Sequence, residues 1–313
     1  MPPSSEPREE RIRLLNEQFE QFLSSEILKE YLEILDIRST DAEDILREME
    51  TYNTRKGADG LIYESQTAPL NAVLEANKPR LFPIYDEMGL VSINKPLTGD
   101  GFDKIIVLGG SANANYNRTA AVAGYLKENV DEVAALSCFR PIPLGERKSC
   151  SHPGPFETEF GAMRFAFTSL FDLTEDTELE SGDYPRNLNL AENIRTFHDE
   201  SGRKYRIFAS PSLIDTERPG TYDTIVHYLR NIGDGNARRI LVITNNQYCN
   251  YQFIPFAQAL LEYGCDNMDF EIIGCSDDDH LISPEKYNTN QFFGDIKSEI
   301  EWIIKFRKSL IEG

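Results

Sequence analysis

The chain has no long hydrophobic run. Hydrophobic residues make up 40% of its 313 residues, but no apolar stretch approaches the ~20 residues that a membrane-spanning helix requires. The first residues, Met1 to Ser5, have neither the basic nor the apolar region of a secretory signal peptide. We therefore expect a soluble, cytoplasmic protein with no membrane span.

Basic residues are few relative to acidic ones. The chain has 32 Lys and Arg residues against 52 Asp and Glu residues, which gives a formal net charge of −20, and no block of Lys or Arg reverses this charge locally. An acidic protein repels a polyanion. Nucleic acid is therefore not an expected partner.

Cysteine and histidine are also scarce, and neither has the spacing of a metal site. The five cysteines form no C-x-x-C pair and are odd in number, which favours reduced thiols. The four histidines contain no H-E-x-x-H motif. A zinc knuckle is therefore not supported, and a His-based metal site is possible only through a coincidence of the tertiary structure. The acidic run Asp277 to His280 could ligate a divalent cation through its oxygens, although such runs are more often solvated loops.

Two nucleotide-binding motifs are missing as well. The chain contains neither G-x-G-x-x-G nor G-x-x-x-x-G-K-[ST]. A classical dinucleotide-dependent dehydrogenase and a P-loop NTPase are therefore both disfavoured.

The N-terminal part, which we place at residues 1–100, is predicted to be an acidic helical accessory region followed by a connector. Apolar residues recur at helical spacing from Arg11 to Phe22 and from Ile27 to Ile37. A capping box from Thr40 to Glu43 predicts a third helix that continues through Tyr52. These helices could form a layer or lid, and their acidic surface could contact a partner protein.

Residues 101–313 alternate strands with helices, which indicates an α/β domain with a doubly wound, mainly parallel, five-stranded sheet. The predicted strands are Lys104 to Leu108, Glu132 to Ser137, Lys204 to Ala209, Arg239 to Thr244 and Phe270 to Gly274. The predicted helices are Asn117 to Lys127, Glu157 to Phe171, Leu190 to Asp199, Thr221 to Asn231, Tyr251 to Tyr263 and Ile296 to Ile311.

The first strand ends in a turn suited to a ligand. Gly109 and Gly110 allow a positive φ and a close approach of the backbone. A helix starting near Asn115 to Asn117 would direct unpaired amide N–H groups and a positive dipole end at an anion. We predict that Gly109 to Asn115, including Ser111 and Asn113, cradle the ligand. The alternative is an ordinary turn of an α/β protein.

Polar clusters follow all five predicted strands. Because the carboxyl ends of parallel strands share one edge of the sheet, these clusters should converge on one crevice. The clusters begin at Gly109, Cys138, Ser210, Asn245 and Cys275.

Arg118 and Arg140 are the predicted anion clamp. A guanidinium can bind a phosphate or carboxylate with two hydrogen bonds, although an Arg at the end of an element often forms a surface ion pair. Glu159 is the candidate general acid or base, or acceptor of a ligand hydroxyl. The alternative for Glu159 is a carboxylate stabilised by the N-terminal dipole of its helix.

The amides of Asn245 and Asn246 are predicted to line the far wall, because they offer donors and acceptors without charge. Thr221 is a further candidate ligand contact, although it is first a helix-capping residue. Ser111 has the surroundings of a nucleophile elbow without its second glycine and without a His clearly placed as a base. A serine hydrolase is therefore disfavoured.

The order of several motifs resembles the YdcF/SanA/ElyC family over about residues 103–275. These motifs are Ile106 to Gly110 with Arg118, Leu136 to Arg140, Thr158 and Glu159 with Met163, Pro219 to Thr224, and Ile240 to Thr244. The resemblance implies a Rossmann-like domain of largely undefined activity. The nearest comparison is the soluble YdcF-like branch, which implies S-adenosylmethionine or a nucleotide as the ligand.

Within the resemblance, Gly109, Gly110 and Arg118 match the glycine turn and the helix-opening Arg of the family. Glu159 matches its glutamate, and Thr221 stands at the start of its Thr-x-Glu-Asn motif. Two positions depart from the pattern. No His or Arg follows the fourth predicted strand at Asn245, and Thr224 replaces an Asn. These departures weaken the case for shared catalytic chemistry.

These observations together predict that the sheet edge binds a nucleotide-like or other phosphate- or carboxylate-bearing small molecule. If the protein is catalytic, it would be a transferase, or a hydrolase of a phosphorylated or nucleotide-sugar substrate, with Glu159 as acid or base. The alternative is a non-catalytic module that senses a metabolite or binds a protein.

Overall fold

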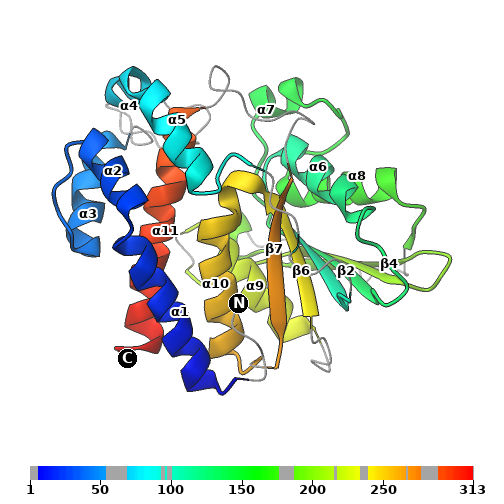
Figure 1. The fold of residues 1–313 in the computed structure, drawn as a ribbon. Helices are drawn as coiled ribbons and strands as arrows, with labels where there is room; N and C mark the ends of the chain where they lie inside the picture. Colours follow the sequence, from blue (N-terminus) through cyan, green and yellow to red (C-terminus); the bar gives the residue numbers. More distant parts are fainter. Residues whose placement is uncertain are drawn as a thin grey trace.

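The computed structural model describes residues 6–53, 69–92, 96, 101–175, 187–214, 217–232, 239–265, 267–275 and 288–312. Within these residues the chain forms an α/β fold around a seven-stranded, mostly parallel sheet, with N-terminal helices beside it (Figure 1). The strand order is β3-β4-β5-β2-β1-β6-β7.

All five predicted strands are present and pair in parallel. They are β1 (Lys104–Leu108), β2 (Glu132–Ser137), β5 (Lys204–Ala209), β6 (Arg239–Asn245) and β7 (Asp269–Cys275). Every residue of β1 and β2 is buried. Such continuous burial is typical of parallel strands covered on both faces.

The predicted helix from Leu190 to Asp199 is wrong. Residues Asn193–His198 instead form strand β4, which pairs antiparallel with β5 along its whole length. The short β3 (Thr174–Glu175) extends the sheet beyond β4. Phe197 of β4 is fully buried in the core under this part of the sheet. The predicted five-stranded sheet lacked this strand. The sheet is therefore mixed.

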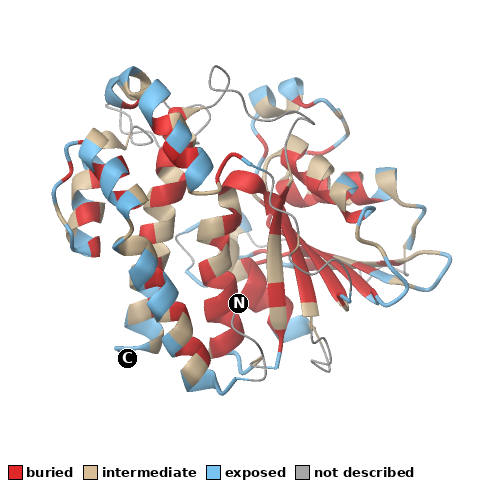
Figure 2. Cartoon of the chain, viewed as in Figure 1, coloured by how far each residue is buried: buried red, intermediate tan, exposed pale blue. Residues whose placement is uncertain are grey.

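Helices cover both faces of the sheet, and alternate residues of β1 separate the two cores. Ile105 and Val107 share one core with residues of α6 (Ala112–Val122) and α8 (Glu159–Leu170). Ile106 and Leu108 share the other core with residues of the helices on the opposite face, α9 (Thr221–Asn231) and α10 (Cys249–Glu262). Figure 2 shows the resulting buried interior of the sheet.

The N-terminal helices pack on one another and on the last helix. They are α1 (Arg8–Leu23), α2 (Glu26–Ile34), α3 (Ala42–Met49), η1 (Glu50–Tyr52), α4 (Ala72–Ala76) and α5 (Lys78–Glu87). The predicted helices at Arg11 and Ile27 are thus present. The third helix begins after Asp41, not Thr40, because the carboxylate of Asp41 accepts hydrogen bonds from the amides of Glu43 and Asp44.

Helix α11 (Thr289–Leu310) joins the helical layer to the sheet (Figure 1). Phe292, Ile296 and Ile300 belong to the core of the N-terminal helices, whereas Ile303 and Phe306 belong to a core beside the sheet. The helix starts earlier than the predicted Ile296 because Asn288 caps it. The division of the chain near residue 100 stays a prediction.

The remaining short elements lie in connections. They are α7 (Leu144–Ser149), η2 (Leu188–Leu190) and η3 (Asn246–Tyr248). Across the part of the chain that the structure describes, no helix has the length and apolar character that a membrane crossing would need.

Candidate functional site

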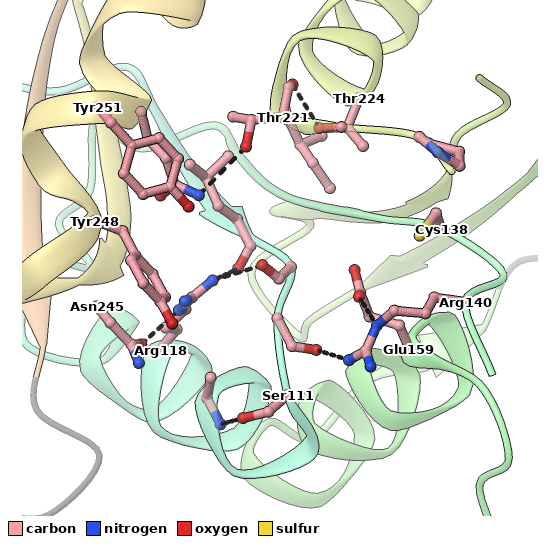
Figure 3. A pocket seen from close by; sticks show the side chains of 18 of the residues that line it. Ser111, Arg118, Cys138, Arg140, Glu159, Thr221, Thr224, Asn245, Tyr248 and Tyr251 are labelled. Atoms are coloured by element: carbon pink, nitrogen blue, oxygen red, sulfur yellow. Dashed lines mark hydrogen bonds and ion pairs between the residues drawn. The ribbon is translucent and has the colours of Figure 1, made fainter. Parts of the chain in front are cut away.

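A pocket of about 260 Å³ lies at the carboxyl ends of β1, β2 and β6 (Figure 3). Its position follows from the strand order. The chain passes from β1 to β2 on one side, whereas β6 enters the sheet on the other side of β1. Parallel sheets open a crevice where the strand order reverses in this way. The pocket therefore occupies the place where α/β folds commonly hold ligands.

The structure brings most of the predicted site residues to this pocket. The predicted residues that line it are Gly109, Gly110, Ser111, Arg118, Arg140, Glu159, Thr221 and Asn245. Asn113, Asn115 and Asn246 do not line it. Their participation in ligand binding stays a prediction.

The two glycines of the turn lie close to neighbouring groups, and the contact is tighter at Gly109 than at Gly110. A Cβ on Gly109 would overlap the carboxylate of Glu159 and lie 2.7 Å from the carbonyl oxygen of Leu136. A Cβ on Gly110 would lie 3.1 Å from both terminal nitrogens of Arg118. Neither glycine adopts the positive φ that glycine allows, because the described glycines with positive φ are Gly89, Gly101, Gly202 and Gly264.

Helix α6 begins at Ala112, ahead of the predicted start near Asn115 to Asn117. The hydroxyl of Ser111 caps the helix and accepts a hydrogen bond from the amide of Ala114 at 3.2 Å. The amide of Ala112 donates to Glu146 Oε1 at 2.9 Å. Two early amides of α6 thus already have protein acceptors, which weakens the predicted use of this helix start as an anion cradle.

Asn115 and Asn113 hold the turn in place. Asn115 is fully buried, accepts a hydrogen bond from the amide of Gly110 at 2.8 Å, and donates to the carbonyl of Glu159 at 3.3 Å. Asn113 accepts from the amide of Ser151 at 2.8 Å. These two amides therefore fix the backbone around the pocket and do not face it.

Arg118 is a buried cation at the pocket wall, with 1% of its surface exposed. Its Nη1 donates to the carbonyl oxygens of Leu108 at 2.6 Å and Gly109 at 2.7 Å. Its Nε donates to Asn245 Oδ1 at 2.7 Å, and its guanidinium lies 5.6 Å from the ring centre of Tyr248. All these partners are neutral. Among the described residues, no carboxylate forms an ion pair with Arg118.

Arg140, by contrast, is paired with acids. Its Nε donates to Glu159 Oε2 at 3.0 Å, and its Nη1 lies 3.4 Å from Glu146 Oε2. Its Nη2 donates to the carbonyl of Gly110 at 3.0 Å. Two carboxylates therefore offset the charge of Arg140, and its role includes tying α8 to the glycine turn.

Glu159 can hold a proton more readily than an exposed glutamate. It is the first residue of α8, and Thr158 caps that helix by accepting from the amide of Gly161. Burial raises the pKa of the Glu159 carboxyl, and the positive charge of Arg140 opposes this rise only in part. A buried carboxyl with a raised pKa is suited to proton transfer.

Cys138 follows β2 and lines the pocket beside Glu159. Burial and the negative charge of Glu159 raise the pKa of the Cys138 thiol to about 12. The thiolate is the nucleophilic form of cysteine. Cys138 is therefore a neutral, unreactive wall residue at ordinary pH.

Asn245 and Asn246 have different roles. Asn245 lines the pocket and accepts the hydrogen bond from Arg118. Asn246 is buried away from the pocket, where its Nδ2 donates to the carbonyl of Gly89 at 3.1 Å. It therefore ties the end of β6 to the segment after α5. Thr221, at the start of α9, accepts from Gln252 Nε2 at 3.3 Å.

Several lining residues were not among the predicted site residues. They come from the segment before α9 (Arg218, Pro219, Gly220), from the end of η3 and the start of α10 (Tyr248, Tyr251, Gln252) and from α11 (Gln291, Gly294, Asp295, Ser298). The residues of α11 fall at i, i+3, i+4 and i+7, which is one face of a helix. The spacing of Gln291, Asp295 and Ser298 was the available signal, but the predicted helix began at Ile296 and so left out Gln291 and Asp295.

A Ser–His–Glu arrangement lies outside the pocket lining. His227 Nδ1 is 3.1 Å from Ser210 Oγ, and His227 Nε2 is 3.2 Å from Glu192 Oε2. Ser210 is fully buried, so substrate cannot reach its hydroxyl. None of the described residues that line the pocket is a histidine. Among the residues that the structure describes, Ser111 therefore has no histidine base in the pocket. That the protein is not a serine hydrolase stays a prediction.

The acidic run Asp277 to His280 lies outside the described residues, so its predicted use as a cation site stays a prediction. Within the described residues, no group of three or more His, Cys, Asp or Glu side chains is arranged to hold a metal ion.

The chain matches no protein-family model, no curated protein and no solved structure. The resemblance to the YdcF/SanA/ElyC family therefore stays a prediction.

Proposed function

We propose that the pocket binds a small molecule carrying a phosphate or carboxylate group, with Arg118 as its main charge partner. The observation that carries this proposal is the environment of Arg118. The side chain is buried at the pocket wall, yet its hydrogen-bond partners are two carbonyls and one amide. A buried charge is costly unless it is paired. The Glu159 carboxylate acts on Arg118 only without direct contact, and an anionic ligand would supply a countercharge in contact with the guanidinium.

A chemical reaction at this site would use Glu159. Its carboxyl lies beside the glycine turn, where the Cβ of any larger residue at position 109 would overlap it. With its raised pKa, Glu159 could give or take a proton during group transfer or hydrolysis of a phosphorylated substrate. Membership of the YdcF-like branch, with S-adenosylmethionine or a nucleotide as ligand in a Rossmann-like domain, would fit the same site.

A second candidate function is metabolite sensing without catalysis. One helix, α11, lines the pocket with Asp295 and packs into the N-terminal helical core with Ile296 and Ile300. A ligand that contacts Asp295 would therefore touch the same rigid element that supports the helical layer. That layer could then pass the signal to a partner protein.

The test is ligand-induced stabilisation of the full-length protein. Thermal unfolding would be measured with inorganic phosphate, AMP, ATP and S-adenosylmethionine, each with and without Mg²⁺. A ligand present at 100 times its dissociation constant stabilises the fold by about 2.7 kcal/mol. We expect Arg118→Gln to abolish the shift and Arg118→Lys, which keeps the charge, to retain part of it.

The matched control is Arg230→Gln on the exposed side of α9, where the Arg contacts Tyr263. This variant should bind like the wild type. A folded Arg118→Gln protein with an unchanged ligand-induced shift would contradict the proposal. So would the absence of any shift with every anion tested.

A further inference from the structure

A polar face of α11 forms a wall of the pocket distinct from the glycine turn. Gln291, Asp295 and Ser298 face the pocket together with Gly294. Neighbouring Phe292 and Ile296 pack into the core of the N-terminal helices. The apolar side of α11 therefore fixes the helix, and its polar side is presented to the pocket at the spacing of one helix face.

The groups on this wall suit hydroxyl recognition. Gln291 Nε2 donates to the hydroxyl of Tyr248 at 2.7 Å, which orients the amide. Asp295 is a buried carboxylate that acts electrostatically on the hydroxyl of Tyr251. Ser298 adds a hydroxyl that can both donate and accept. A carboxylate, an amide and a hydroxyl together can bind several ligand hydroxyls at once.

The pocket is modest in size and has a polar lining. Its volume of about 260 Å³ is below the roughly 300–1,000 Å³ of pockets that enclose drug-sized ligands. The lining beyond Arg118 is mainly polar, including Gln252 and Thr224. Buried polar groups left without partners are costly, and hydroxyls can both donate to such groups and accept from them. A sugar ring carries several hydroxyls in a small volume.

We infer that the pocket binds a phosphorylated sugar or polyol, with the phosphate beside Arg118 and the hydroxyl groups on the Asp295 face of α11. This inference rests on the proposed anion-binding function and names the class of its ligand. Asp295 is then the residue that determines specificity, because it recognises the part of the ligand that inorganic phosphate lacks.

The experiment is calorimetric titration of the full-length protein with inorganic phosphate, a panel of hexose and pentose phosphates, O-phosphoserine and AMP. We expect at least one sugar phosphate to bind ten or more times more tightly than inorganic phosphate, O-phosphoserine or AMP. Asp295→Asn should weaken the affinity for that sugar phosphate by tenfold or more. It should leave the affinity for inorganic phosphate within about twofold of the wild-type value. Ser298→Ala should give a smaller loss of the same kind.

The matched control is Glu301→Gln, which removes a half-exposed carboxylate of α11 that is paired with Lys305. It should leave all affinities unchanged. If phosphate binds but no sugar phosphate binds more tightly, the inference fails and the proposed function stands. If O-phosphoserine binds tightest, Asp295 recognises an ammonium group and the inference also fails. If none of the anions binds, both the inference and the proposed function are overturned. Ser298→Ala keeps the test decisive if Asp295→Asn does not fold.

Discussion

At the scale of single residues, the two glycines of the turn meet different neighbours. The space beside Gly109 is closed by the Leu136 carbonyl, which is backbone, and by a carboxylate that is itself held by Arg140. The space beside Gly110 is closed only by the end of the Arg118 side chain. The Leu136 carbonyl cannot move without displacing β2, whereas the end of the Arg118 side chain can shift slightly.

We therefore predict that Gly109→Ala destabilises the protein by about 1–3 kcal/mol, as overpacking of a close-packed site does. Gly110→Ala should cost less, and its main effect should be on ligand binding through Arg118. Chemical denaturation of both variants measures the difference. Equal destabilisation by the two substitutions would show that the backbone contact at Gly109 is not limiting.

A second prediction at this scale concerns the ionisation of Glu159. Because the folded state raises the pKa of this carboxyl, the folded state holds the proton more tightly than the unfolded state. The stabilisation from the bound proton is complete below the unfolded pKa of about 4.3 and is lost as pH rises through the folded pKa. Glu159→Gln removes this loss.

The melting temperature of Glu159→Gln relative to wild type should thus increase as pH rises from about 4 towards neutrality. Thermal unfolding over this pH range is the measurement, and Glu33→Gln, at an exposed position, is the control that should show no such trend. A difference that stays constant with pH would mean that Arg140 fully offsets the burial of Glu159.

At the scale of elements, the start of α3 shows which of two adjacent residues caps the helix. The carboxylate of Asp41 accepts from the amides of Glu43 at 2.9 Å and Asp44 at 3.2 Å, and Thr40 is exposed one residue earlier. The pattern Thr-x-x-Glu satisfied the capping box, but the adjacent Asp forms the cap. Two overlapping signals one residue apart cannot be separated by pattern alone.

We predict that Asp41→Ala costs about 0.5–2 kcal/mol of unfolding free energy, which is the usual cost of removing a helix cap. Thr40→Ala should change stability by less than about 0.5 kcal/mol, as exposed substitutions do. Urea denaturation of the two variants distinguishes the alternatives. A larger loss from Thr40→Ala would reassign the cap to the threonine.

Strand β4 shows why one element was predicted wrongly. The segment from Asn193 to His198 contains Ile194, Thr196 and Phe197, whose branched and aromatic side chains favour strands. Their spacing did not distinguish a strand from a helix, because only part of this strand is buried. What decides the strand is its antiparallel pairing with β5, a partner that lies along the chain after it.

At the scale of the whole molecule, α11 ties the N-terminal helices to the sheet. Ile300 is fully buried in the helical core, and Ile303, less than one turn later, is fully buried beside the sheet. One continuous helix therefore contributes to both cores. Unfolding either part removes packing from the other.

We predict a single cooperative thermal transition for the described parts of the chain. Ile300→Ala should lower the unfolding free energy by about 2–5 kcal/mol, the range for truncation of a buried aliphatic residue, and should lower the one melting temperature. Calorimetry is the measurement. Two separate transitions, with only one of them shifted by the substitution, would support independent units divided near residue 100.

The sequence by itself determined the parallel strands and most of one pocket wall. Each of these strands is a short apolar run ended by glycine or polar residues, and the carboxyl ends of parallel strands must share an edge. Gly109, Arg118, Arg140, Glu159 and Asn245 could be brought together on that reasoning, and all five line the pocket.

Only the tertiary structure decided which side chains face the pocket and what completes it. Asn115 and Asn246 lie next in sequence to residues that line the pocket. Their side chains instead form hydrogen bonds with the backbone of Gly110 and Gly89 and do not face the pocket. Asp295 and Gln291 come from a helix far along the chain. Their approach depends on how α11 packs between two cores, and the local spacing of polar residues in this helix does not show which distant elements it packs against.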